Sequence, residues 1–341
     1  MILVTGGTGL VGAHLLLDLC KKGFEPRAIY RNKSRIKLTQ DLFFEMGCED
    51  VFSQIDWKKA DLLDITELTD AFKGVKKVYH AAAMISMSRR DDELMRKVNI
   101  EGTANMVNLS LYFGVEKFCH VSSIAAIEKN PFGGLSVESE DWNPQNHKDG
   151  YSITKYGAEM EVWRGSQEGL SVAVVNPGVI IGPGFDKQGS GKLIRRAIKG
   201  IPFYTQGSVG FVGVNDVVEI MQTLMNSTIE NERFILVSEN LSYRNFFTQI
   251  AKISGAAIPS KKAGRLLLEL AWALSSLSRF LRLKKGGMTR QTLKSSLTKS
   301  SFDNSKIKLF LPDFEFEPMQ KVILETVNYS LTSSSPESSK V

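Results

Sequence analysis

A tyrosine and a lysine lie four residues apart in the stretch YSITK, at Tyr151 and Lys155. Residues with this spacing share one face of a helix. A free tyrosine has a pKa of about 10, and a neighbouring ammonium group lowers that pKa because it favours the phenolate. The pair is therefore suited to general acid and base catalysis between a carbonyl and an alcohol. The alternative is an ordinary surface pair, which contributes little.

Two serines upstream favour the catalytic interpretation. Ser122 and Ser123 follow an apolar run that ends at Val121. A hydroxyl in such a position can donate a hydrogen bond to a substrate oxygen. The alternative for these serines is a local turn or a helix cap.

The opening stretch MILVTGGTGLVG predicts an element that holds a nucleotide. Residues 2–4 are an apolar run typical of a buried strand, and leucines recur at helical spacing from Leu10 to Lys22. Glycines in the turn between them let the backbone approach a pyrophosphate, toward which the first N–H groups of the helix point. The flanking strand and helix favour this interpretation over a mere tight turn. The glycines that carry the spacings G-x-x-G-x-x-G and G-x-G-x-x-G are Gly6, Gly7, Gly9 and Gly12.

The end of the second predicted strand indicates which dinucleotide is used. Residues 27–30 form this strand, and Arg31 follows it. Dehydrogenases that prefer NAD usually place an Asp or Glu here to bind the ribose 2′-hydroxyl. A guanidinium suits a 2′-phosphate instead, so the sequence favours NADP over NAD. The alternative is that Arg31 is one solvated charge in the basic loop 31–35.

Strand-like and helix-like segments alternate through the first half of the chain. Besides the elements already named, strands are expected at residues 57–62, 75–83, 117–123 and 171–178, and helices at 65–72, 91–113 and 151–164. This alternation predicts an α/β protein with a Rossmann-type, doubly wound parallel sheet and helices on both faces. Ligands bind beyond the carboxyl ends of the strands in such sheets.

The second half of the chain is less regular. Glycines and a proline mark a loop region between residues 182 and 191, and further strands are expected at 211–218 and 233–237, before helices from Tyr243 to about Leu283. We expect an NAD(P)-binding domain over residues 1–180, to which 211–237 returns. A smaller, mostly helical substrate-binding part would comprise 181–210 and 238–331. The Ser-rich residues 332–341 are expected to be disordered.

The composition argues against several other classes of protein. Hydrophobic residues make up 43% and charged residues 23% of the 341 residues, as in an ordinary soluble enzyme. The net charge of +6 is mild and its Lys and Arg are scattered, so nucleic acid is not an expected partner. The three cysteines are too few for a disulfide framework, and the four histidines show no metal-ligand spacing. No signal peptide is expected, so the predicted location is cytoplasmic.

Residues 265–283 form a strongly apolar segment. We expect this segment to cover a substrate pocket or a partner helix, so a membrane contact is not expected, and a peripheral contact is the alternative. A spanning helix is disfavoured by its charged residues. These are Arg265, Glu269, Arg279 and Arg282.

Taken together, the motifs resemble those of the extended short-chain dehydrogenases/reductases, in the NAD(P)-dependent epimerase/dehydratase superfamily. The matching pieces run in family order: TGGTGLVG (5–12), DLLD (61–64), HAAA (80–83), VNIEGTANMV (98–107), VSSIAAI (121–127), YSITK (151–155), NPGVIIGPG (176–184) and FVGVNDVV (211–218). The chain is most similar to members that resemble dihydroflavonol-4-reductase and 3β-hydroxysteroid dehydrogenase. Homodimers are common in this family, so a homodimer is a possible assembly.

The resemblance implies a role for each matching residue. Tyr151 would be the catalytic acid and base, Lys155 would hold the nicotinamide ribose and lower the tyrosine pKa, and Ser123 would be the catalytic serine. Asp61 and Leu62 would meet the adenine. The other residues implied at the cofactor are Gly6, Thr8, Gly9, Leu10, Val11, Gly12, Arg31, Ala81, Ala82, Ala83, Asn99, Val121, Ser122, Pro177 and Gly178.

The sequence leaves three functions open. Nucleotide-sugar epimerases and dehydratases usually carry, in the later strand, an Arg that binds the sugar-nucleotide phosphate, and this chain has Val209 there. We therefore favour a reductase or dehydrogenase of a fairly apolar small molecule, with the nucleotide-sugar epimerase as the alternative. A dinucleotide-binding regulator without turnover is a third possibility, but it predicts a broken set of catalytic residues.

Overall fold

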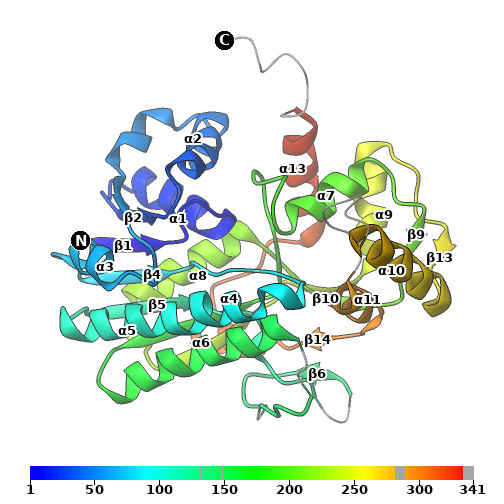
Figure 1. The fold of residues 1–341 in the computed structure, drawn as a ribbon. Helices are drawn as coiled ribbons and strands as arrows, with labels where there is room; N and C mark the ends of the chain where they lie inside the picture. The colour runs from blue at the N-terminus through cyan, green and yellow to red at the C-terminus, as the bar shows by residue number, and fades with distance from the viewer. Residues whose placement is uncertain (131–132, 141, 147–148, 281–288, 333–341) are drawn as a thin grey trace.

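The computed structural model describes residues 1–130, 133–140, 142–146, 149–280 and 289–332 (Figure 1). Its centre is a seven-stranded sheet in which every neighbouring pair is parallel. From one edge to the other, its strands are β11 (Glu232–Leu236), β7 (Val172–Pro177), β5 (Lys117–Val121), β4 (Lys77–His80), β1 (Ile2–Thr5), β2 (Arg27–Tyr30) and β3 (Asp56–Lys59). Because the strands are parallel, all their carboxyl ends meet at one edge of the sheet, as predicted.

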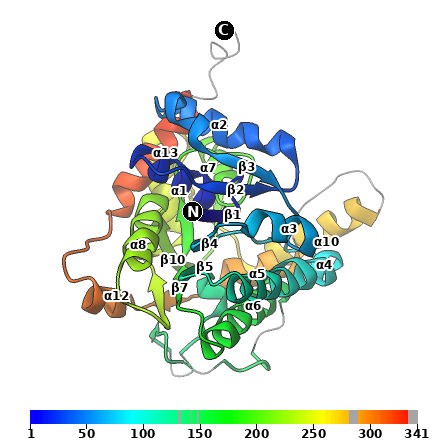
Figure 2. The ribbon, with the colours of Figure 1, turned by 90° about the vertical axis from the view of Figure 1, so that its left-hand side faces the viewer.

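Helices cover both faces of this sheet (Figure 2). On one face, α1 (Leu10–Lys21) and α8 (Val214–Asn226) bury apolar side chains in one hydrophobic core. On the other face, α3 (Ile65–Phe72), α5 (Gly102–Tyr112) and α6 (Gly150–Gln167) enclose a second core. This arrangement confirms the doubly wound fold that the alternating pattern predicts.

A smaller part packs beside the carboxyl edge of the main sheet. It contains a three-stranded sheet of β12 (Glu239–Ser242), β10 (Ser208–Gly213) and β8 (Val179–Ile181). Three helices share a third core with these strands: α7 (Gly191–Ile198), α9 (Tyr243–Ser254) and α13 (Met319–Thr332). The remaining elements are α2 (Ile36–Glu45), α10 (Arg265–Phe280), α11 (Arg290–Leu297), α12 (Ser305–Phe310) and the two-residue strands β6 (Leu135–Ser136), β9 (Phe203–Tyr204), β13 (Lys261–Lys262) and β14 (Ser301–Phe302).

Three predicted elements differ from the structure. The strand expected at 211–218 ends at Gly213, and α8 begins at Val214. Val214, Val217 and Val218 looked strand-like in sequence, yet they line the buried face of the helix. The single helix expected at 91–113 consists of α4 (Asp92–Arg96), a π-helical turn at Lys97–Glu101 and α5. Helix α7 begins at Gly191, directly after the predicted loop region, and was not predicted because glycines precede it in the sequence.

Two of the expected segments lie only partly within the described residues. The apolar segment 265–283 forms α10 as far as Phe280, and the residues after it lie outside them. Of the tail expected at 332–341, Thr332 ends α13 and the others lie outside the described residues. Within the described part, no helix is long and apolar enough to cross a membrane. No group of three or more His, Cys, Asp or Glu side chains there is placed to hold a metal ion.

Candidate active site

The glycine-rich loop between β1 and α1 is too tightly packed for side chains. Gly6 has a φ of +75°, and a Cβ added to it would lie 2.7 Å from the carbonyl carbon of Ala81. A Cβ on Gly12 would lie 2.3 Å from the oxygen of Gly6. The Gly9 N–H donates to that same oxygen at 2.9 Å, and α1 begins at the next residue. The loop therefore brings bare backbone and a helix N-terminus together, which fits a dinucleotide pyrophosphate.

A buried chain of hydrogen bonds holds the neighbouring β4 turn against this loop. Thr5 Oγ1 lies 2.8 Å from Nδ1 of His80 and accepts from the Ala82 N–H at 3.1 Å. The other ring nitrogen of His80 lies 3.0 Å from Oγ1 of Thr103. Burial lowers the pKa of His80 to about 3, so the ring is neutral and can both donate and accept. These bonds fix the small residues 81–83 beside the glycines.

Asn99 joins the β4 turn to the helix that carries the tyrosine. Its amide exchanges two hydrogen bonds with the backbone of Met84, at 2.7 and 2.9 Å. Its Nδ2 also donates to Oγ1 of Thr154 on α6, at 3.1 Å. Asn99 lies in the π-helical turn, and such turns are frequent at functional sites. The Asn99 side chain thus connects the turn after β4 to α6.

The predicted ribose and adenine residues lie on the far side of the glycine loop. Arg31 follows β2 with its side chain 69% exposed, and one guanidinium nitrogen is 4.0 Å from the carboxylate of Asp61. Leu62 is buried next to Asp61, and Asn105 donates to its carbonyl at 2.8 Å. These positions follow β2 and β3, and the strands β4 and β1 lie between them and β5, which precedes the catalytic candidates.

The catalytic candidates meet where β5 ends and α6 begins. Asp149 caps α6 by accepting from the Ser152 N–H at 2.8 Å, and this sets the helix start that carries Tyr151. Ser123 lies next to Tyr151, close enough to act on the pKa of its phenol. One turn further along, the ammonium group of Lys155 donates to the carbonyl of Val121 at 2.8 Å.

The pKa values in this cluster differ from the expectation. Burial raises the pKa of Tyr151 above its ordinary value, although the hydrogen bond from Ser123 acts in the opposite direction. The expected lowering of this pKa by Lys155 is therefore wrong for the arrangement described. Burial lowers the pKa of Lys155 itself from 10.5 to about 8, while the carboxylate of Glu159 raises it. The phenol is protonated at neutral pH, and the lysine loses its proton near pH 8.

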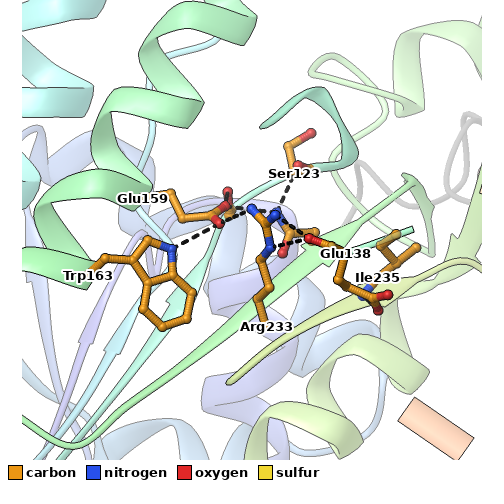
Figure 3. A network of polar contacts seen from close by, with 8 residues as sticks. Ser123, Glu138, Glu159, Trp163, Arg233 and Ile235 are labelled. Atoms are coloured by element: carbon orange, nitrogen blue, oxygen red, sulfur yellow. Dashed lines mark hydrogen bonds and ion pairs between the residues drawn. The ribbon is translucent and has the colours of Figure 1, made fainter. Parts of the chain in front are cut away.

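Sequence reasoning missed a buried carboxylate beneath the serines, on Glu159 (Figure 3). One of its oxygens accepts from Ser122 Oγ at 2.6 Å and from Asn176 Nδ2 at 2.9 Å. The other accepts from Trp163 Nε1 at 3.3 Å and from Arg233 at 3.0 Å. The same Asn176 nitrogen donates to the Ser123 carbonyl at 3.1 Å. Four-residue spacing from Lys155 was the available signal, because it places Glu159 on the same face of α6.

Pro177 and Gly178 lie where β7 ends, at the margin of the same cluster. The Gly178 N–H donates to the carbonyl of Leu236 at 2.9 Å. A Cβ on Gly178 would lie 2.3 Å from the oxygen of Gly210. This position therefore admits only glycine where the main sheet meets the three-stranded sheet.

The predicted residues follow the order of the strands along the carboxyl edge. Gly178 follows β7, Ser123 follows β5, and the small residues 81–83 follow β4. The glycine loop follows β1, and Arg31 follows β2. The edge thus carries, in this order, the candidate catalytic residues, the glycine-rich loop and the exposed cation of Arg31. This row fits an extended dinucleotide.

Comparisons with known proteins agree with this geometry. Residues 2–236 match the model of the NAD dependent epimerase/dehydratase family. A putative dihydroflavonol 4-reductase from a Synechocystis species is 30% identical over 276 residues, which is 79% of this chain and 77% of that protein. The UDP-glucose 4-epimerase of Vibrio cholerae is 29% identical over 70% of each chain. The crystal structure of gox2253 is 28% identical and superposes with a TM-score of 0.80 over 98% of both chains. The chain belongs to the NAD dependent epimerase/dehydratase family.

Proposed function

We propose that the protein is an NAD(P)-dependent oxidoreductase that reduces a carbonyl or oxidises a secondary alcohol. The observation that carries this proposal is that Ser123 and Tyr151 are neighbours at the carboxyl end of β5, with Lys155 one turn along the helix that carries Tyr151. Such a pair offers two hydroxyls to one substrate oxygen. The similarity to a putative dihydroflavonol 4-reductase supports a small, fairly apolar substrate.

Each catalytic side chain has a distinct task in this proposal. NAD(P), when bound, supplies or accepts a hydride. In the reducing direction, Tyr151 donates its proton to the carbonyl oxygen, which suits a phenol that burial keeps protonated. Ser123 donates a hydrogen bond to the same oxygen and stabilises the charge that develops there. Below about pH 8, Lys155 keeps an ammonium group that donates to the Val121 carbonyl and so holds the end of β5 next to the tyrosine helix.

For the cofactor, we propose NADP over NAD. Arg31 is exposed beyond β2 and has room to meet a 2′-phosphate. A charge-assisted hydrogen bond to a phosphate is worth about 1.5–3 kcal/mol. The Asp61 carboxylate beside it is the feature that favours a ribose hydroxyl instead, as in NAD.

For the substrate site, we propose residues 181–210 and 238–331. Their described residues supply most of the core shared by α7, α9 and α13. Val209 supports an apolar substrate, because it lies partly buried in β10 and offers no charge to a diphosphate.

A nucleotide-sugar epimerase is the second candidate, on the strength of the similarity to the Vibrio cholerae enzyme. An epimerase returns its hydride within one turnover, so it consumes no cofactor overall. A regulator without turnover is disfavoured by the intact set of Ser123, Tyr151 and Lys155.

The test is to follow the absorbance of reduced nicotinamide with purified protein. NADPH and NADH are each offered with a panel of aldehydes, ketones and UDP-sugars. Net consumption with a carbonyl is the result that we expect. A cofactor that stays bound through purification, with no net consumption and with interconversion of a UDP-sugar, would establish the epimerase instead.

A further inference from the structure

Helix α10 presents leucines to solvent. Leu266 is 80% exposed and Leu270 is 62% exposed, and their four-residue spacing places them on one face of the helix. Leu267 beside them is also exposed, whereas Leu268 is buried and anchors the helix. Figures 1 and 2 both show α10 at the margin of the molecule, away from the main sheet. This apolar face lies on the surface of the protein, which differs from the expectation that it covers a pocket.

The sequence in and around α10 is strongly basic. In the sequence, residues 261–294 hold nine basic residues and one acidic residue, Glu269, a net charge of +8. The whole chain carries +6, so the rest of it is slightly negative. Lys261, Lys262 and Arg265, which lead into α10, are exposed. Arg290 and Lys294 are exposed on α11, and the Arg290 guanidinium lies 5.2 Å from the centre of the Trp272 ring on α10.

We propose that α10 docks on an anionic lipid bilayer. The surface that docks consists of Leu266, Leu267 and Leu270, with Lys261 and Lys262 beside them. Helices with an apolar face and basic flanks lie in the interface, with the leucines in the acyl boundary and the cations at the headgroups. Negative lipids attract each nearby Lys or Arg, and the attraction falls off within a Debye length.

The exposed cations and leucines together favour an anionic bilayer over a second copy of the chain or a nucleic acid. A second copy of the chain would bring its own exposed Lys261 and Lys262 against this surface, and the repulsion opposes a symmetric contact. A nucleic acid would satisfy the cations but would leave the leucines without an apolar partner. An anionic bilayer satisfies both features.

The test is sedimentation of the full-length protein with vesicles. One set contains phosphatidylcholine alone, and the other adds about 30% phosphatidylglycerol. We expect binding to the anionic vesicles only, and we expect it to weaken as salt is raised. The double variant Leu266→Ser/Leu270→Ser should lose at least about tenfold in affinity, and Lys261→Glu/Lys262→Glu should lose a similar amount.

A matched control and thermal denaturation separate docking from damage to the fold. Leu309→Ser removes an equally exposed leucine on α12 and should bind vesicles like the parent. All variants should melt like the parent protein. The proposal is overturned if anionic vesicles bind no protein, or if the leucine pair can be removed without loss. It is also overturned if removing that pair abolishes self-association instead. Because the readout is binding, these results are independent of the enzymatic activity proposed above.

Discussion

Replacing Glu159 with glutamine should destabilise the fold strongly. All four groups that contact its carboxylate donate hydrogen bonds, two to each oxygen. An amide that replaces the carboxylate must therefore turn its NH₂ group toward two donors. The partner cation, Arg233, is only 19% exposed, so it cannot recover full hydration. Removing one partner of a buried ion pair costs about 3–5 kcal/mol, and we expect a loss in this range for Glu159→Gln.

Equilibrium unfolding in urea at neutral pH measures this loss. The matched control is Asp70→Asn, which neutralises a carboxylate in the exposed pair with Lys73 and should unfold close to the parent protein. If the free energy of unfolding of Glu159→Gln is within about 1 kcal/mol of the parent value, the hydrogen bonds from Ser122, Asn176 and Arg233 do not stabilise the fold as expected. Equal losses in the two variants would refute the reasoning in the same way.

The remaining predictions concern the cofactor and Lys155. Gly12→Ala should lower cofactor affinity at least about tenfold, since its Cβ meets backbone. The control is Gly264→Ala, whose added Cβ would meet nothing within 4 Å. Titration calorimetry should give this variant the same cofactor affinity as the parent. Arg31→Ala should weaken NADPH by about 10- to 100-fold and NADH little, with Lys33→Ala as control, and equal losses for both cofactors would remove the argument for NADP. Because the pKa of Lys155 is about 8, kcat/KM should fall as pH rises through 8, and a flat profile to pH 9 would contradict it. The unfolded lysine titrates near 10.5 and binds more protons between these values, so this group makes stability rise from pH 8 to 10.5.

Local patterns made the cofactor half of the molecule predictable. The strand, glycine turn and helix of the first 21 residues form as expected because each signal is contained within one short window. Helix α3 matches its predicted bounds, Ile65–Phe72, and Asp64 caps it by accepting from the Glu67 N–H. Tyr151 and Lys155 lie on one helix for the same reason.

Contacts between distant segments were beyond the reach of these patterns. Val214 continues an apolar run, and only its packing in the core beside α1 makes it helical rather than extended. In the sequence Glu159 resembles a surface carboxylate, but in the fold it accepts hydrogen bonds from Ser122, which follows β5, and from Arg233 in β11. The raised pKa of Tyr151 likewise depends on burial, which no spacing of residues reveals.

Single-turnover hydride transfer by Tyr151→Phe tests the central claim most directly. The variant is mixed with NADPH and the most reactive carbonyl of the panel, and Tyr156→Phe, on the same helix, serves as the control. Because Tyr151→Phe lacks the proposed proton donor, its rate of hydride transfer should be about 10²–10⁴-fold lower than that of the parent. Its affinity for NADPH, measured by fluorescence, should stay within about twofold of the parent value because only one hydroxyl is removed. Tyr156→Phe should react like the parent. A Tyr151→Phe rate close to that of the parent would contradict the role of Tyr151 as the acid and base.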